Sequence, residues 1–263
     1  MSRVGHFLRF AARGNDSVRI AVASNDGNVS ILASTNPPMP DTFLSANIEV
    51  ALHAGIAALR EDRTGKERNY YRISGVGMCP RKQVAERAGL PPTNPPDPRS
   101  VFKMWAGTVL HEAAQKALTS VGYLNPLHTE AEVTYECYVG HPDGVTQDGN
   151  SVVELKTTDD NAIVRYEMPL HYLWQGFTYC LALKKTSLIV LQVGRSQGLT
   201  RSRVYHLDDE FIMALDDHIR EMTQAWAAYK TYNRLPPHDH TRFSWQDKTC
   251  PYLDVAGRPN PEV

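Results

Sequence analysis

The chain has 263 residues and a formal net charge of −1, with 42% apolar and 22% charged residues. These values are typical of one large or two small globular domains. They exclude a chain whose overall charge attracts nucleic acid or an anionic membrane, so a polyanionic partner needs a local basic patch.

Membrane and secretion signals are not evident in the sequence. There is no run of about 18 uncharged apolar residues, and the start, MSRVGHFLRFAARGNDS, lacks the apolar segment and cleavage site of a signal peptide. The four cysteines, Cys79, Cys137, Cys180 and Cys250, are widely spaced and form no Cys-x-x-Cys pair. This spacing favours a reducing, cytoplasmic compartment over a disulfide framework.

The first 40 residues are predicted to form a small β extension, separate from a second domain at residues 41–263. Turn signals between β-branched runs over residues 5–33 indicate a hairpin or a three-stranded meander. The proline-rich segment 34–42 is typical of a linker.

Helical periodicity of the apolar residues follows the linker. It predicts helices at 44–63, 79–90 and 100–122. In the second of these, Pro80 suits the first turn and Gly89 suits the position just after the helix.

The second half alternates strands and helices. Strands are predicted at 132–140 and 151–158, on either side of the turn signal QDGN, and again at 186–194 and 201–207. Helices are predicted at 168–185 and 208–232, the last opened by acidic residues that complement the helix dipole.

The segment SVVELKTT places charged residues inside an apolar strand. Alternate residues of a strand share a face, so Glu154 and Lys156 lie on one side while Val153 and Leu155 lie on the other. We expect the apolar side to pack and the charged side to face water, a partner or a metal. The turn should return this strand beside 132–140, so that Asp143 and Glu154 converge at one sheet edge.

Two converging carboxylates repel each other unless a cation lies between them. Hard oxygen ligands favour Mg²⁺ or Mn²⁺ over zinc, and Lys156 beside such an ion could orient or deprotonate a water. That arrangement suits phosphodiester hydrolysis. The alternative is a solvated strand face, with the Asp-Gly pair serving only as a turn.

Further polar residues stand on the neighbouring predicted helices. His111 lies on the helix at 100–122, and Gln175 and Tyr179 share one face of the helix at 168–185. Taken singly, each is also compatible with an ordinary surface or half-buried residue.

In this order the motifs resemble the PD-(D/E)xK nuclease superfamily, in its RecB-like branch, and especially its phage recombination exonucleases. The matching elements are the histidine of GTVLH, the Asp of GHPD, the ExK of ELK and the Gln and Tyr of QGFTY. They span Gly107 to Tyr179, and weaker similarity extends over residues 70–252.

The resemblance implies a fold and a set of site residues. The fold class is α/β, with a central mixed β-sheet flanked by helices (a restriction-endonuclease-like core). The implied catalytic residues are Asp143, Glu154 and Lys156, and the implied metal ligands are His111, Asp143, Glu154 and the Leu155 carbonyl. Gln175 and Tyr179 would hold DNA or orient the lysine and carboxylates, and Glu132 is a further acidic candidate.

The implied function is a Mg²⁺- or Mn²⁺-dependent DNA exonuclease acting in recombination or DNA end processing, in the cytoplasm of a bacterium or a phage-infected host. Its partners would be DNA and a recombination or single-strand-annealing protein, and an oligomer is compatible with the resemblance. The alternatives are an endonuclease with the same site and a non-cleaving nucleic-acid-binding scaffold.

Basic residues suggest where DNA would bind. Arg81 and Lys82 lie in the first turn of a predicted helix, where backbone N–H groups and both cations could face a phosphate. Solvated charges at a helix start are the alternative. Further candidates are Arg195, Arg201 and Arg203.

Some RecB-like nucleases hold an iron–sulfur cluster with one upstream and three downstream cysteines. Only Cys79 and Cys250 suit such positions here, so we expect no four-thiolate cluster. An alternative is a zinc site formed by Cys79, Cys250, His238 and His240, and the simpler alternative is a tail that packs over Cys79 without metal.

Overall fold

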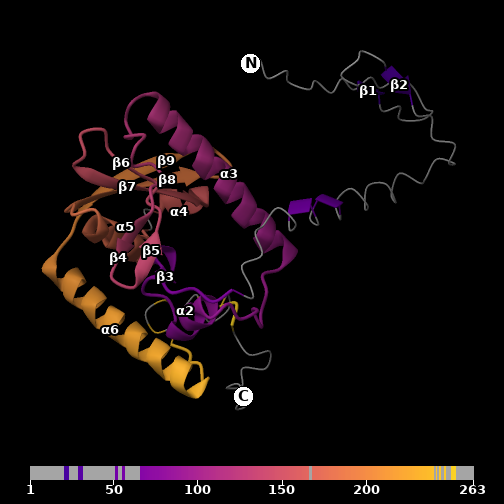
Figure 1. Ribbon diagram of the computed structural model, residues 1–263. Helices are drawn as coiled ribbons and strands as arrows, with labels where there is room; N and C mark the ends of the chain where they lie inside the picture. Colours follow the sequence, from indigo (N-terminus) through magenta and orange to yellow (C-terminus); the bar gives the residue numbers. More distant parts are fainter. Residues whose placement is uncertain are drawn as a thin grey trace. The chain divides into compact units, whose positions relative to one another are not determined.

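Figure 1 shows a computed structural model of the chain. It describes residues 21–23, 29–31, 51–52, 55–56, 66–165, 168–239, 241, 243, 246 and 250–252. The chain divides into two compact units, Met1–Gly55 and Ile56–Val263. In the first unit, β1 (Ala21–Ala23) and β2 (Val29–Ile31) pair antiparallel. A third strand of the predicted meander, the linker and most of the helix predicted at 44–63 lie outside the described residues.

The second unit contains two sheets packed against helices (Figure 1). Their strand orders are β3-β5-β4 and β6-β7-β8-β9. The strands are β3 (Tyr71–Arg72), β4 (Val133–Tyr135), β5 (Tyr138–Gly140), β6 (Gly144–Val145), β7 (Ser151–Thr158), β8 (Ser187–Gly194) and β9 (Thr200–His206). β3–β5 and β7–β8 pair parallel and the other pairs are antiparallel. The predicted mixed α/β class is therefore confirmed.

Helices cover both faces of β7. On one face Val153 and Leu155 pack with Leu124 and with α3 (Pro98–Ser120). On the other, Val152 belongs to the core cluster beneath α5 (Leu170–Ala182). Of the three surroundings expected for the charged side of this strand, water is therefore not the one found at Glu154, because β7 is an inner strand covered on both sides.

The strand predicted at 132–140 is two strands. Glu136 adopts a left-handed conformation, with φ 51°, and the chain reverses there so that β4 pairs with β5. β5 then pairs with β3, and the antiparallel neighbour of β7 is the short strand β6. The predicted turn at QDGN is present between β6 and β7, with Gly149 at φ 74°.

The helices of the second unit agree with the sequence pattern. The remaining helical elements are η1 (Ile73–Gly75), α2 (Pro80–Arg87), α4 (Asp160–Val164) and α6 (Asp209–Tyr232). Pro80 opens α2, and Gly89 follows it at φ 71°. α4 was not predicted, because a single turn is too short for apolar periodicity to appear. No described helix is long and apolar enough to cross a membrane.

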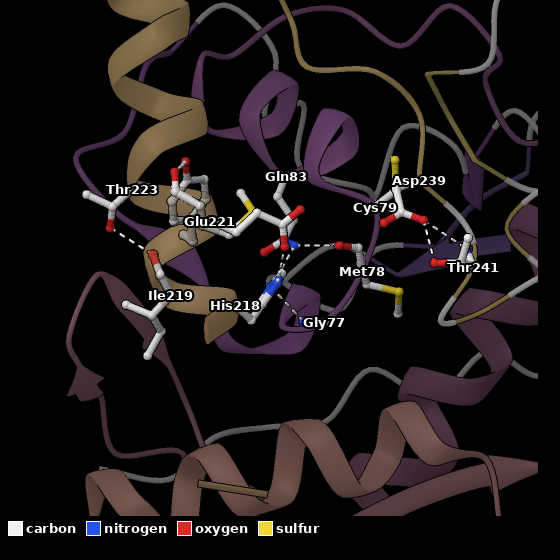
Figure 2. A network of polar contacts seen from close by, with 12 residues as sticks. Gly77, Met78, Cys79, Gln83, His218, Ile219, Glu221, Thr223, Asp239 and Thr241 are labelled. Atoms are coloured by element: carbon white, nitrogen blue, oxygen red, sulfur yellow. Dashed lines mark hydrogen bonds and ion pairs between the residues drawn. The ribbon is translucent and has the colours of Figure 1, made fainter. Parts of the chain in front are cut away.

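A buried histidine joins α6 to the rest of the core (Figure 2). The backbone N–H of Gly77 donates to His218 Nε2 at 3.0 Å, so a neutral ring carries its proton on Nδ1, which lies 3.2 Å from Glu221. The Tyr138 hydroxyl and the Gln83 amide also lie within 3.3 Å of Nε2. These contacts connect α2, β5 and α6, and a fully buried imidazole is stable only with such partners.

We predict that Gly176→Ala destabilises the second unit. A Cβ at this α5 position would lie 2.5 Å from both terminal carbons of Leu188 on β8. Overpacking of this kind costs about 1–3 kcal/mol, measurable as a shift in the denaturant midpoint.

The matched control is Leu188→Ala in the same background, which removes the opposing atoms. The double variant should be more stable than the sum of the two single effects predicts. Strict additivity would show that α5 and β8 are not in contact at this position.

Candidate active site

Asp143 joins the two sheets and contacts a helical histidine. It follows β5 and precedes β6, and it is buried. Its Oδ1 lies 3.1 Å from Nε2 of His111 on α3, and its Oδ2 accepts the backbone N–H of Leu155 at 2.5 Å. The predicted approach of His111 to Asp143 is thus present, and the carboxylate is fixed against β7.

A second carboxylate, Glu130, lies in the same cluster. Gln115 on α3 donates through Nε2 to the Asp143 carbonyl at 2.7 Å and to Glu130 Oε1 at 3.1 Å. Three residues, His111, Glu130 and Asp143, each offer one ligand atom, and these three atoms all lie within 4.8 Å of one another. These three residues form the candidate metal site. Glu132, named from the sequence, is exposed and lies 3.8 Å from His141 instead.

No sequence motif pointed to Glu130. It has a left-handed backbone, with φ 55°, in the segment before β4, and its N–H donates to the Pro142 carbonyl. A non-glycine residue in this conformation is uncommon and is often found at functional sites. The conformation is set by a contact between segments distant along the chain, so it is not visible in the residue pattern.

A buried Glu154 and a half-buried Lys156 form an ion pair on the α5 side of β7. Glu154 is fully buried, and Lys156 Nζ lies 2.5 Å from its Oε1. Nζ also donates to Gln175 Oε1 at 2.9 Å, and it lies 5.2 Å from the ring centre of Tyr172. Gln175 therefore holds the lysine in place from the first half of α5.

Tyr179 lies one helical turn beyond Gln175 and is buried. A Cβ on Gly140 would approach its hydroxyl to 2.8 Å and the Cβ of Ile73 to 2.9 Å. The glycine of the GHPD motif thus lets α5 lie against the end of β5, immediately before Asp143. This packing favours a supporting role for Tyr179, whereas contact with DNA stays a prediction.

The charges of the pair are strongly coupled. Burial, then the neighbouring Asp143, raises the pKa of Glu154 to about 8, while Lys156 opposes this rise. Burial also disfavours the charge of Lys156, but the Glu154 and Asp143 carboxylates outweigh it and raise its pKa. For Glu154 the effect of complete burial is larger than that of the Lys156 contact, so the pKa of its carboxyl is raised.

The pKa of His111 is raised, whereas burial alone lowers the pKa of an imidazole. Its contact with Asp143 raises its pKa, against the effect of burial.

The donor atoms fit a divalent cation. Among the described residues, the buried His111 Nε2 and the Glu154 carboxylate oxygens have no hydrogen-bond partner beyond their ionic contacts with Asp143 and Lys156. Buried polar atoms are normally hydrogen-bonded, so each exception needs a reason. Carboxylate oxygens with one imidazole are suitable ligands for Mg²⁺ or Mn²⁺. Glu154 lies outside the group of three ligand atoms, and coordination by Glu154 and the Leu155 carbonyl stays a prediction.

Arg81 and Lys82 lie in the first turn of α2, as predicted. Arg81 is buried and donates from its guanidinium to the Pro236 carbonyl at 3.4 Å. Lys82 Nζ lies 3.9 Å from Glu86. Contact of either residue with DNA stays a prediction.

The candidate zinc ligands converge only in part. Cys79 Sγ lies 3.9 Å from His238 Nδ1, and Cys250 interacts with the Cys79 thiol. That thiol contact is the main reason that the pKa of Cys79 is lowered to about 4. Burial opposes the shift, and backbone hydrogen bonds add to it. His240 lies outside the described residues, so a zinc site here stays a hypothesis.

Comparisons with known proteins give no family assignment. No protein-family model matches the chain, and no curated protein matches it. Among solved structures, the alkaline exonuclease LHK-Exo from Laribacter hongkongensis is 15% identical, with a TM-score of 0.42 over 49% of this chain and 71% of that one. LHK-Exo in complex with dAMP is 14% identical, with a TM-score of 0.45 over 59% and 80%. The structure of SSO0001 is 15% identical, with a TM-score of 0.45 over 79% and 93%.

We predict that Glu154→Gln flattens the pH dependence of stability in metal-free protein. The folded-state pKa of about 8 exceeds the ordinary value of 4.5, so the folded protein holds an extra proton between these pH values. Stability therefore falls as pH rises from about 4.5 to about 8. Glutamine does not titrate.

Urea unfolding at pH 5 and pH 8 in a chelator measures this effect. The wild type should lose on the order of a few kcal/mol more than the variant over this range. Glu112→Gln, at an exposed position on α3, is the matched control and should keep the wild-type slope. Equal slopes in wild type and Glu154→Gln would contradict the burial argument.

We also predict that Glu130→Gln weakens Mn²⁺ binding by at least about tenfold, because it removes a charged ligand while preserving the acceptor for Gln115. Titration calorimetry provides the measurement. The control is Glu132→Gln, two residues away and exposed, which should bind Mn²⁺ as the wild type does. The reverse order of affinities would move the site from Glu130 to Glu132.

Proposed function

We propose that this chain is a Mg²⁺- or Mn²⁺-dependent deoxyribonuclease that hydrolyses DNA phosphodiester bonds, as an exonuclease in recombination or end processing. One observation carries the proposal: the buried Glu154 carboxylate lies against the Lys156 ammonium and near Asp143, and it has no hydrogen-bond partner beyond that ammonium among the described residues. Burial of a carboxylate in this way lowers the stability of the fold, so stability alone does not explain why Glu154 is there.

Some of these residues would bind the cation, and others would position the reacting groups. His111, Glu130 and Asp143, with Glu154, would hold the cation, which when bound polarises the phosphate and lowers the pKa of a bound water. Lys156, held by Gln175, would orient the attacking water or stabilise charge developing on the phosphate. Asp143 is itself positioned by the Leu155 N–H, so ligand and lysine are carried by the same strand.

Two alternatives use the same fold. An endonuclease would have the same site and differ in how DNA enters it. A non-cleaving nucleic-acid-binding scaffold would need neither the half-buried lysine nor its amide partner, so the contact between Lys156 and Gln175 favours the enzyme. A recombination or annealing partner protein and an oligomer belong to this proposal as predictions.

We predict that Lys156→Ala lowers the rate of DNA hydrolysis by at least roughly a hundredfold, which is the usual contribution of a group that assists proton transfer. Removal of divalent ions with a chelator should abolish hydrolysis in the wild type, and Mg²⁺ or Mn²⁺ should restore it. DNA binding by the variant should persist, because the ammonium is engaged inside the protein.

The substrates for this assay are linear duplex DNA and covalently closed circular DNA. Degradation of the linear form alone supports an exonuclease, and cutting of the closed circle supports the endonuclease. Wild-type hydrolysis that Lys156→Ala leaves unchanged would rule out the role assigned to the lysine. DNA binding by a wild type that cuts neither substrate would support the scaffold.

A further inference from the structure

The carboxyl ends of β7 and β8 lie side by side. The two strands pair parallel, with Lys156 opposite Gln192 and Thr158 opposite Gly194. Arg195 is the first residue after β8, and its backbone N–H donates to the Thr158 carbonyl at 3.1 Å. At about 3.3 Å per residue, Thr158 is roughly 7 Å along the strand from Lys156. Arg195 therefore stands at the rim of the candidate active site.

Asp160 fixes the turn that carries Arg195. Its carboxylate is buried and accepts the Ser196 N–H at 2.9 Å, the Ser196 hydroxyl at 2.5 Å and the Gln197 N–H at 3.1 Å. The turn lies so close that a Cβ at Gly194 would be 2.2 Å from Asp160 Oδ1. A carboxylate with three donors from one turn holds that turn rigidly, although every residue from Arg195 to Gly198 is exposed.

The guanidinium of Arg195 is not used to hold this fold. The residue is exposed, and its side chain forms no hydrogen bond or ion pair within the part of the chain that the structure describes. It nevertheless begins close to the active site, because its backbone N–H is bonded to Thr158, which lies two residues beyond Lys156 on β7. Burial raises the pKa of the Tyr172 hydroxyl, and the positive charges of Lys156 and Arg195 oppose the rise.

We propose that Arg195 is a substrate-contact residue that binds a backbone phosphate next to the one under attack, and that Asp160 is the positioning residue that holds the Arg195 turn in place. This inference rests on the proposed nuclease function. A planar guanidinium can donate two parallel hydrogen bonds to phosphate oxygens. Its preset backbone reduces the entropy lost on binding.

The first experiment measures DNA hydrolysis and DNA binding by Arg195→Ala with Mg²⁺ at several KCl concentrations. We expect KM and Kd for duplex DNA to rise roughly tenfold, from the loss of one charge-assisted contact. The slope of log K against log salt should become shallower by about 0.9, which corresponds to one phosphate contact. Because no contact with the reacting phosphate is lost, kcat at saturating DNA should stay unchanged.

Two further substitutions serve as controls. Arg195→Lys keeps the charge without the planar fork and should restore part of the affinity and the full salt slope. Arg220→Ala removes an exposed arginine of α6 that is paired with Asp217, and it should leave KM and the salt slope at wild-type values.

A double-mutant cycle tests the role of Asp160. Asp160→Asn replaces one carboxylate oxygen by an NH₂ group, so one of the donors from the turn loses its acceptor. We expect this variant to raise KM when Arg195 is present and to have no further effect when Arg195 is already alanine. Thermal unfolding confirms that each variant is folded.

The outcomes separate this inference from the proposed function. A wild type that neither cuts nor binds DNA refutes both the nuclease and the phosphate contact. A wild type that cuts, together with an Arg195→Ala variant of unchanged KM and salt slope, refutes only the phosphate contact. An equal effect of Asp160→Asn with and without Arg195 refutes the positioning role.

Discussion

The burial of Glu154 on an inner strand is the constraint on which the site depends. A carboxylate that leaves water costs several kcal/mol, and a buried ion pair seldom recovers that cost in full. Lys156 compensates in part, but its ammonium is shared with Gln175. The remaining charge balance must come from protons or from a cation, and this is why the strand is better explained by chemistry than by stability.

Several segments that are distant along the chain must pack correctly to exclude water from this carboxylate. α5 can lie against β8 because Gly176 has no side chain to meet Leu188. It can reach β5 because Gly140 leaves room for the Tyr179 hydroxyl. Asp143 belongs to the connection between the two sheets, so its position depends on both of them. A shift of α5 would therefore change the solvation of Glu154 and the placement of Asp143 together.

Local patterns predicted the elements well, and long-range packing decided the rest. The strands 151–158 and 186–194 and the helices around Pro80, His111 and Gln175 follow from periodicity and from cap residues, which act within a few positions. The reversal at Glu136 was missed, because alternation continues through VTYECYV and nothing local marks a left-handed residue. Whether Glu154 faces water was left open for a related reason: period-two alternation shows which residues share a face, but not whether a helix covers that face. The choice of Glu130 over Glu132 likewise depends on Gln115, a partner on the distant helix α3.

The charge of the whole chain is a poor guide to its local fields. A net charge of −1 gives no general attraction for a polyanion, yet Lys82, Lys156 and Arg195 all act on the first turn of α5. His171 in that turn adds no charge at neutral pH, because burial, together with Lys156 and Lys82, lowers its pKa to about 4. The positive field there comes from lysine and arginine side chains. An anion bound at this turn would therefore respond to salt, which screens all three cations, much more than to pH between 6 and 8.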